Sequence, residues 1–301
     1  MREPDPRIEV AVASPSVLGE SPLWHPREQV LYWCDIAGRR LNRFDPANRA
    51  LSHWDLDSEP ACIAAALDGT MLIAMRDGLW RFDTAAGQRT RLAEPPYDPK
   101  TERFNDGKCD PLGRFWVGTI YEPRDRPAAA LYCWGHGKLE RKASDITSSN
   151  GLAWSPDART MYWADTAAHT VYAIDLDGVD CEMSPRRVFM QFPPKRPGQN
   201  LIDYGGRPDG AAMDVEGGYW IAMFEGQRLL RLSPEGRVLR EVVLPVRCPT
   251  MPCFGGADLR TLYVTTSREK RPAAELIEQP LAGCVLSLRV DVPGLPAHMA
   301  A

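Results

Sequence analysis

Residues 161–175 read Met-Tyr-Trp-Ala-Asp-Thr-Ala-Ala-His-Thr-Val-Tyr-Ala-Ile-Asp, two short apolar runs separated by a polar break. Aromatic and β-branched side chains alternate with small or polar ones in both runs, which is typical of half-buried β-strands. Five further copies of this unit lie at residues 31–45, 71–83, 115–134, 219–233 and 262–288. A repeat of about 40 to 60 residues indicates a propeller or a solenoid. The sequence therefore predicts an all-β fold, a six-bladed β-propeller with four-stranded antiparallel blades.

The composition of the chain agrees with a fold made of short strands and tight turns. The 301 residues include 27 prolines and 24 glycines, the residues that preset turn dihedrals or allow positive φ. No linker, low-complexity run or shift in composition divides the chain. We expect a single propeller domain over residues 1–301.

Four copies of the repeat carry a polar residue at nearly the same place. It stands 11 to 13 positions before a tryptophan: Glu20 before Trp33, Asn105 before Trp116, Asn150 before Trp163, and Asp209 before Trp220. Equivalent positions in blades around one axis bring side chains together at the central channel. One such residue before a glycine is usually a turn residue, but four at one offset favour a site. Their oxygens suit a hard divalent cation.

Charge and segment composition exclude several kinds of partner. A formal net charge of −4 with scattered basic residues does not suit a phosphate-binding surface, so we expect no nucleic acid partner. No apolar run has the length of a membrane span, and the charged, proline-broken N-terminus does not resemble an export signal. Eight cysteines without a Cys-x-x-Cys pair indicate reduced thiols in a cytoplasmic protein, although their even number leaves disulfides open. We expect a monomer or a weak homo-oligomer.

The usual catalytic motifs are missing from the chain. There is no Gly-x-Ser-x-Gly nucleophile elbow, no glycine-rich phosphate loop and no His-Glu-x-x-His pair. The ring of side-chain oxygens is therefore the main candidate site.

Five segments in order resemble the regucalcin and gluconolactonase family, and the resemblance extends from about Leu18 to Val290. The segments are LGESPLW (18–24), RFNDGKCDPLGR (103–114), SNGLAWSPD (149–157), RPDGAAMD (207–214) and PCFGGADLRTLYVT (252–265). The resemblance implies a six-bladed propeller with calcium- or zinc-dependent sugar lactonase activity.

The resemblance also implies roles for individual residues. The metal ligands of the family, a Glu, an Asn and an Asp, fall on Glu20, Asn150 and Asp209. Its substrate-contacting Arg and Asn fall on Arg103 and Asn105. A further substrate-binding Glu of the family corresponds to Pro123, and the nearest acidic residue is Glu122, one place earlier.

The chemistry of the proposed ligands agrees with one divalent metal cation. Glu20, Asn150 and Asp209 offer only oxygen, which favours Ca²⁺ and leaves Mg²⁺, Mn²⁺ and Zn²⁺ open. Three protein ligands leave coordination positions for water and substrate. We expect Asp209 to act as general base, with water activated by the metal as an equal alternative. Arg103 would bind hydroxyls or stabilise an oxyanion, and Asn105 would bind a sugar hydroxyl.

The connection over residues 193–208 is longer than its counterpart in the family and ends next to Asp209. Long loops are often functional, so we expect this one to form part of the pocket rim, with Tyr204 and Arg207 as candidate specificity residues. A solvated surface loop is the alternative.

Three functions remain open from the sequence. The leading hypothesis is a metal-dependent lactonase that opens a small-molecule sugar lactone to its aldonic acid in carbohydrate catabolism. A second is a hydrolase of other lactones, esters or organophosphate-like compounds, because one metal site can serve several electrophiles. The third is a non-enzymatic calcium-binding propeller.

Overall fold

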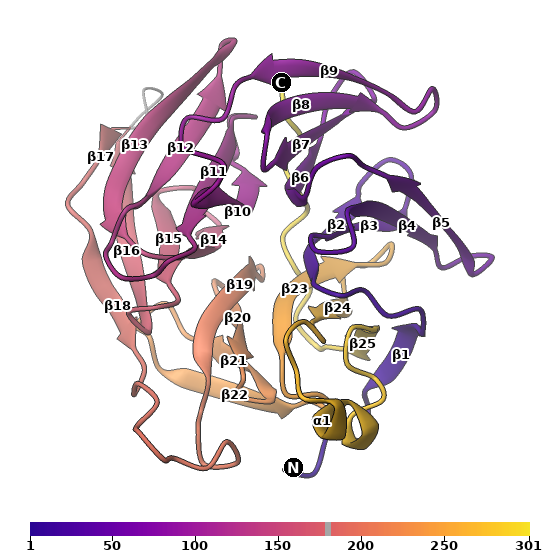
Figure 1. The fold of residues 1–301 in the computed structure, drawn as a ribbon, viewed down its shortest axis with the longest axis vertical. Helices are drawn as coiled ribbons and strands as arrows, with labels where there is room; N and C mark the ends of the chain where they lie inside the picture. The colour runs from indigo at the N-terminus through magenta and orange to yellow at the C-terminus, as the bar shows by residue number, and fades with distance from the viewer. Residues whose placement is uncertain (178–181) are drawn as a thin grey trace.

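The strands of the protein form six antiparallel sheets arranged in a ring (Figure 1). This computed structural model describes residues 1–177 and 182–301. The innermost strand of each sheet contacts the innermost strands of its two neighbours, which closes the ring. The predicted all-β, six-bladed propeller is thus confirmed.

Three blades follow one another in the first half of the chain, each written here from its innermost strand outward. The first has β2 (Gly19–His25), β3 (Val30–Asp35), β4 (Arg40–Asp45) and β5 (Ala50–Asp55). The second has β6 (Pro60–Ala65), β7 (Met71–Met75), β8 (Gly78–Asp83) and β9 (Gln88–Ala93). The third has β10 (Glu102–Cys109), β11 (Phe115–Tyr121), β12 (Ala129–Gly135) and β13 (Lys138–Ile146).

The remaining blades complete the ring. The fourth has β14 (Ser149–Trp154), β15 (Thr160–Asp165), β16 (Thr170–Asp177) and β18 (Arg187–Gln191), and β17 (Glu182–Met183) also pairs with β16. The fifth has β19 (Arg207–Met213), β20 (Tyr219–Phe224), β21 (Arg228–Leu232) and β22 (Val238–Val243). The sixth has β23 (Pro249–Gly255), β24 (Thr261–Thr266), β25 (Val285–Arg289) and, from the N-terminus, β1 (Glu9–Val12). The fourth sheet therefore has five strands rather than four.

The six units found in the sequence are the second and third strands of the six blades. Residues 161–175, for example, form β15 and most of β16, paired from Thr160 with Asp175 to Asp165 with Thr170. The tryptophans that define the offset, Trp33, Trp116, Trp163 and Trp220, lie on second strands and are fully buried. Six apolar clusters fill the spaces between neighbouring blades. Burial is thus divided among six interfaces rather than concentrated in one core.

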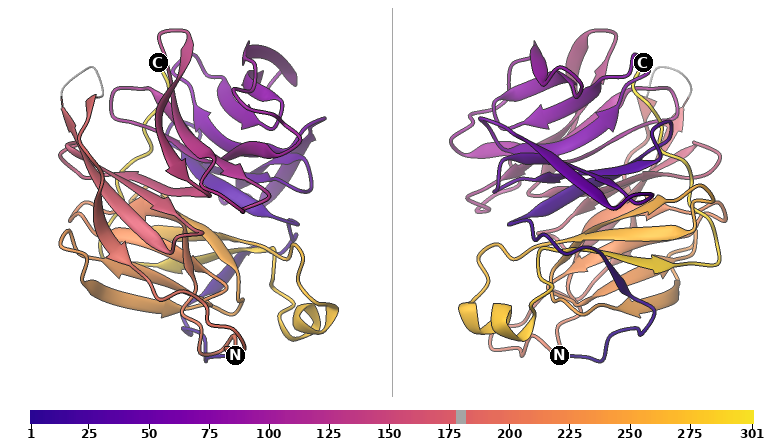
Figure 2. Two further views of the ribbon diagram at one scale, coloured as in Figure 1. Left: turned by 60° about the vertical axis from the view of Figure 1, so that its left-hand side comes forward. Right: turned by 90° about the vertical axis from the view of Figure 1, so that its right-hand side faces the viewer.

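The two ends of the chain close the ring in different ways. Strand β1 pairs with β25, with Glu9 opposite Ser287, so the sixth blade combines the N-terminus with C-terminal strands. After β25 the chain crosses the ring: Gly294 bridges to Asp214, and Ala300 bridges to Ala66. Between β24 and β25 a longer excursion carries the helix α1 (Ala273–Glu278), which projects beyond the strands (Figure 2).

The central channel holds a cavity at each end. A small one, of about 80 Å³, is lined by later residues of the inner strands, such as Lys108 and Met213, and by the C-terminal segment from Leu295 to His298. The other, of about 300 Å³, is lined by earlier residues of the inner strands, including Glu20 and Asp209. Because the C-terminal segment lines the first end, we expect ligands to enter at the second.

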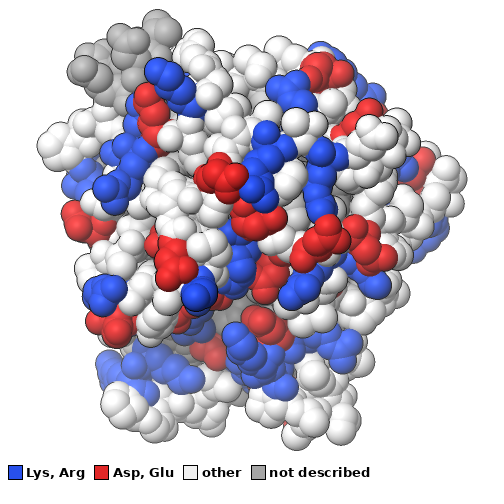
Figure 3. Space-filling view, turned by 45° about the horizontal axis from the view of Figure 1, so that its top comes forward, with Lys and Arg blue, Asp and Glu red and all other residues white. Residues whose placement is uncertain are grey.

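Surface features bear on the expected partners. None of the helices in the described part of the chain has the length and apolar character that a membrane span needs. Basic and acidic side chains are interspersed on the face drawn in Figure 3.

Cys34, Cys62 and Cys109 are buried within strands, as expected for structural thiols, whereas Cys181 lies outside the described residues.

Candidate active site

Four inner strands are irregular at the position of the predicted site residues. Strand pairing shifts register after Glu20 in β2, around Asn105 in β10, after Asn150 in β14 and around Asp209 in β19. A β-bulge leaves a residue unpaired and redirects its side chain. The local sequences allow it, since Pro22 has no amide to pair, and Ser21 and Gly151 adopt positive φ of 48° and 65°. All four side chains line the 300 Å³ cavity.

Glu20 and Asp209 are carboxylates in low-dielectric surroundings. They are 9% and 6% exposed, and among the described residues no basic side chain lies within ion-pair distance of either. Burial, together with the nearby charge of Asp106, raises the pKa of Asp209 to about 8. Burial and the charge of Asp209 raise the pKa of Glu20 well above its usual value. A cation between them would remove both penalties.

Amide side chains connect three blades across the floor of the cavity. Asn105 Nδ2 donates to Asn150 Oδ1 at 3.0 Å and to the Ser149 carbonyl at 2.9 Å. Asn150 Nδ2 donates to Thr166 Oγ1 at 2.7 Å, and that hydroxyl donates to the Pro208 carbonyl, also at 2.7 Å. This series of hydrogen bonds fixes the amide orientation of Asn150, so that its Oδ1 is the atom presented toward the ring of oxygens.

Arg103 is held beside these amides with little freedom. Its Nη1 donates to Asn105 Oδ1 at 2.7 Å and to the Phe104 carbonyl at 2.9 Å. The side chain is almost fully buried, and burial lowers the pKa of its guanidinium. A preorganised guanidinium of this kind suits a developing negative charge or a sugar hydroxyl.

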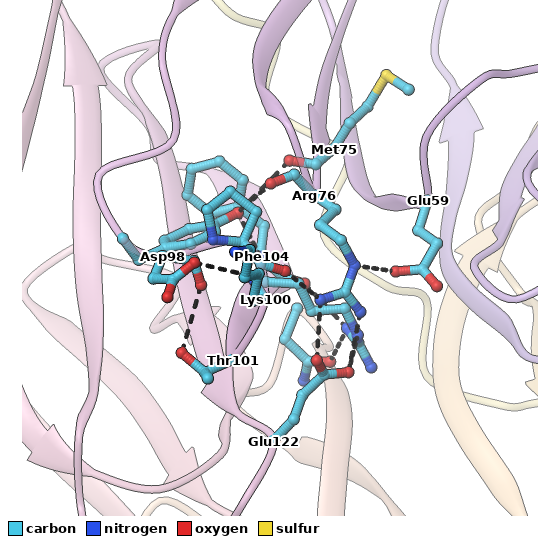
Figure 4. A network of polar contacts seen from close by, with 12 residues as sticks. Glu59, Met75, Arg76, Asp98, Lys100, Thr101, Phe104 and Glu122 are labelled. Carbon is cyan, nitrogen blue, oxygen red and sulfur yellow. Dashed lines mark hydrogen bonds and ion pairs between the residues drawn. The ribbon is translucent and has the colours of Figure 1, made fainter.

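Glu122 is placed differently from the other predicted residues. Its two carboxylate oxygens accept hydrogen bonds from Arg76 Nη1 and Nη2 at 2.8 and 2.9 Å, while Arg76 Nε pairs with Glu59 (Figure 4). The Glu122 carboxylate lies 3.7 Å from Arg103 Nε. It does not line the 300 Å³ cavity. The geometry therefore places Glu122 behind Arg103, as an electrostatic support.

The long connection reaches the cavity through two residues with different surroundings. Arg207 lines it directly. Tyr204 is buried and its hydroxyl lies 2.6 Å from His169 Nε2, so it contacts the cavity through His169, which lines the wall.

Several lining residues have no signal in the sequence. Arg124, Thr166 and His169 come from the turns between the second and third strands of their blades, and Phe224 and Glu269 from other blade ends. Asp106 does have a signal, since it directly follows Asn105: it is buried, Oδ2 accepts from the Leu152 amide at 2.9 Å, and Oδ1 has no partner.

The described residues contain no group of three His, Cys, Asp or Glu side chains arranged around a metal position. The predicted ligand set has two carboxylates, and its third ligand is the Asn150 amide. It therefore does not contain three side chains of those four types. The metal site at the central channel therefore stays a prediction.

Comparisons with known proteins support the resemblance seen in the sequence. The chain is 46% identical over 288 residues to 6-deoxy-6-sulfogluconolactonase from Pseudomonas putida, covering 95% of this chain and 96% of the relative. It is 32% identical over 297 residues to regucalcin from Danio rerio, with 97% of each chain covered. The crystal structure of the calcium-binding protein regucalcin from Agrobacterium tumefaciens superposes with a TM-score of 0.90 at 28% identity, over 97% of this chain and 96% of that one. Residues 18–268 match the family described as SMP-30/Gluconolactonase/LRE-like region, and the chain belongs to that family.

Proposed function

We propose that the protein is a metal-dependent lactonase that hydrolyses a sugar lactone to the aldonic acid in carbohydrate catabolism. The observation that carries the proposal is the pair of buried carboxylates, Glu20 and Asp209, which have no basic partner within ion-pair distance in the described part of the chain and share a cavity with Arg103 and Asn105. The name of the Pseudomonas putida relative supports a lactone as substrate. A cavity of about 300 Å³ is at the lower end of the size range of small-molecule sites.

The donor set fits a hard divalent cation. Glu20, Asn150 and Asp209 would hold it through oxygen atoms, which favours Ca²⁺ over softer metals. When bound, such an ion polarises a carbonyl and lowers the pKa of water. Asn150 Oδ1 accepts one hydrogen bond from Asn105 Nδ2, which leaves the second lone pair of that oxygen for the ion.

Arg103 and Asn105 are positioned to bind the lactone. Arg103 uses Nη1 for two internal hydrogen bonds and its Nε lies 3.7 Å from the Glu122 carboxylate, which leaves Nη2 for the carbonyl oxygen as it becomes an oxyanion. Asn105 uses both N–H groups internally, so it contributes a lone pair on Oδ1 to a sugar hydroxyl.

Asp209 is the proposed general base. It removes a proton from the water that attacks the carbonyl carbon. The bond between the acyl carbon and the ring oxygen then breaks, and the ring oxygen leaves as an alcohol after it takes the proton from Asp209. The product is the hydroxy acid, and the water supplies the added oxygen and both protons.

Proton release at fixed pH tests the proposal directly. Chelated protein is given pentono- and hexono-lactones with Ca²⁺, Mg²⁺, Mn²⁺ or Zn²⁺ added back, alongside Glu20→Gln and the surface control Glu235→Gln. We expect metal-dependent turnover that Glu20→Gln loses and Glu235→Gln keeps.

Two other outcomes would redirect the assignment. Turnover of aryl esters or organophosphates but of no sugar lactone would favour the broader hydrolase. Metal binding without turnover of any substrate would favour a calcium-binding propeller.

A further inference from the structure

Basic residues outnumber acidic ones around the cavity once the two carboxylates of the proposed metal site are left out of the count. Its lining residues include Arg103, Arg124 and Arg207 as cations and Glu20, Asp209 and Glu269 as anions. Glu20 and Asp209 are assigned to the dication. That leaves three guanidinium groups facing one carboxylate.

Arg124 has no ionic partner among the described residues. It follows β11 at the start of the turn into β12, is exposed to solvent and still lines the cavity. Its charge reaches Asp209, since it is one of the groups that lower the pKa of that carboxyl. A guanidinium at a cavity mouth without a carboxylate partner is available for an anionic ligand.

Arg207 is only partly neutralised. Its Nη2 lies 3.6 Å from Glu225 Oε2, but the same carboxylate accepts a hydrogen bond from Arg271 Nη1 at 2.8 Å. The Arg207 guanidinium also packs over the Phe224 ring, with 5.1 Å between Cζ and the ring centroid. One carboxylate thus serves two arginines, and the aromatic contact fixes the direction of Arg207.

The wall between these two arginines is polar but uncharged near neutral pH. His169 comes from the fourth blade, between the third blade of Arg124 and the fifth blade of Arg207. Burial lowers the pKa of His169, and its Nε2 lies 2.6 Å from the Tyr204 hydroxyl. The cationic character of this arc therefore comes from the two arginines.

We propose that Arg124 and Arg207 bind a tetrahedral oxyanion, a sulfonate or a phosphate, on the end of the sugar lactone remote from the reacting carbonyl. A neutral sugar would need neither charge, whereas an anion of this shape accepts several guanidinium hydrogen bonds. The Pseudomonas putida relative is named for a sulfonated lactone. The inference rests on the proposed lactonase function and narrows its substrate class.

Paired substrates test the inference. Gluconolactone, 6-phosphogluconolactone and 6-deoxy-6-sulfogluconolactone differ only in the group at the sixth carbon. The wild type is expected to show a higher kcat/KM for one or both anionic lactones than for the neutral one. Arg124→Gln and Arg207→Gln should each lower the ratio of kcat/KM for the anionic lactone to kcat/KM for gluconolactone about tenfold, mainly through KM for the anionic lactone. The sulfonate and phosphate arms identify which oxyanion the site prefers.

Arg126→Gln is the matched control. Arg126 lies two residues from Arg124, and its guanidinium stacks over Tyr121 at 4.9 Å and does not line the cavity. Arg126→Gln removes the same charge as Arg124→Gln at nearly the same place, so the long-range attraction of an anionic substrate falls equally. The proposed direct contact between Arg124 and the oxyanion is kept. The substrate ratio of this variant should equal that of the wild type.

Each other outcome overturns a distinct statement. A wild type that prefers gluconolactone, or a double Arg124→Gln/Arg207→Gln variant that keeps its preference for the anion, refutes the oxyanion subsite while the lactonase proposal stands. A fall in ratio as large for Arg126→Gln would attribute the preference to overall charge and also refute the subsite. Turnover of pentono-lactones but of none of these three lactones would also refute the subsite, and absence of metal-dependent turnover of any lactone would overturn the lactonase proposal itself.

Discussion

The surroundings of Asp209 determine its protonation state in the metal-free site. Its carboxylate is buried near Asp106 and Glu20, and it has no hydrogen-bond donor among the described side chains. Like charges in a low-dielectric site favour protonation. The metal-free protein therefore keeps a proton at Asp209 to higher pH than the unfolded chain does.

This difference in pKa predicts an unusual pH dependence of the stability of the protein when a chelator keeps it free of metal. The pKa of Asp209 rises from 3.8 to about 8 on folding, so the folded state holds the proton more tightly. Its contribution to stability is full below about pH 4 and is lost as pH rises toward 8. At about 1.4 kcal/mol per pKa unit, we expect the unfolding free energy of metal-free protein to fall by on the order of 5 kcal/mol across this window. Urea unfolding in EDTA at several pH values measures it.

Asp209→Asn is the matching variant, because it keeps the shape and removes the titration. Its stability in EDTA should depend less on pH and exceed that of the wild type near pH 8, while added Ca²⁺ stabilises it much less. An unchanged slope would show that other groups carry the pH dependence. If Asp209→Asn binds metal and still hydrolyses lactone at the wild-type rate, Asp209 is not the general base.

Glu122 gives a second prediction at this scale. Because it bonds to Arg76 and lies behind Arg103, Glu122→Gln should lower kcat/KM less than tenfold. Arg103→Gln, which removes the group inside the cavity, should lower it more than a hundredfold, in line with the roughly 10²–10³ of a lost oxyanion donor.

Coupling between Arg76 and Glu122 separates support from substrate contact. Arg76→Gln should resemble Glu122→Gln, and the double variant should be no worse than either single one. A loss for Glu122→Gln as large as for Arg103→Gln would instead place Glu122 on the substrate.

At the scale of elements, the sequence reveals some strands far better than others. Second and third strands such as β15 and β16 alternate apolar and small residues, so their pattern survives in the sequence and predicts the blades correctly. Inner strands such as β14 contain Gly151 at positive φ and a break in register, which interrupts the period-2 pattern. Outer strands such as β5 are largely exposed and carry little apolar signal.

The site follows the same division. Residues on inner strands, such as Asn150, are predictable because each stands 11 to 13 positions before a buried tryptophan on the neighbouring strand. Arg124 and His169 lie in turns whose residues vary without affecting the blade, so periodicity says nothing of them. Local sequence also does not show that Tyr204 contacts the cavity only through His169, because that contact joins residues 35 positions apart.

Gly118 on β11 tests how closely the third and fourth blades must approach. A Cβ at this position would overlap the Ser149 hydroxyl, which accepts the Trp163 Nε1 hydrogen bond at 2.8 Å. Ser149 precedes Asn150, and its carbonyl accepts from Asn105. Gly118→Ala should therefore cost about 1–3 kcal/mol of stability and weaken metal binding, measured by urea unfolding and by calcium titration.

Gly135→Ala serves as its control within the same sheet. There an added Cβ meets Arg114 Cγ at 3.2 Å, a contact that a shift of a few tenths of an ångström relieves, whereas the Cβ at Gly118 would overlap its neighbour. Wild-type calcium affinity is expected for it. If Gly118→Ala also leaves affinity unchanged, the spacing of these two blades does not set the geometry of the ligands.

At the scale of the whole molecule, the ring depends on one short strand from the N-terminus. Strand β1 covers β25, and Ala11 and Val12 pack with Trp24 and Tyr263 between the sixth and first blades. Without β1, the edge of β25 is exposed to pairing with other chains. Deletion of residues 1–12 should lower the melting midpoint by roughly 10 °C and promote aggregation, as measured by calorimetry and light scattering.

Deletion of residues 1–7 separates strand closure from surface contacts at the same terminus. It removes the bond from the Asp5 amide to the Val243 carbonyl and the pairing of Arg2 with Gln227, but keeps β1 whole. Its melting midpoint should change by only a few degrees. Since Glu20 lies just after this closure, on the inner strand of the first blade, the longer deletion should also weaken calcium binding. Equal midpoints for the two truncations would mean that contacts between the inner strands hold the ring closed without β1.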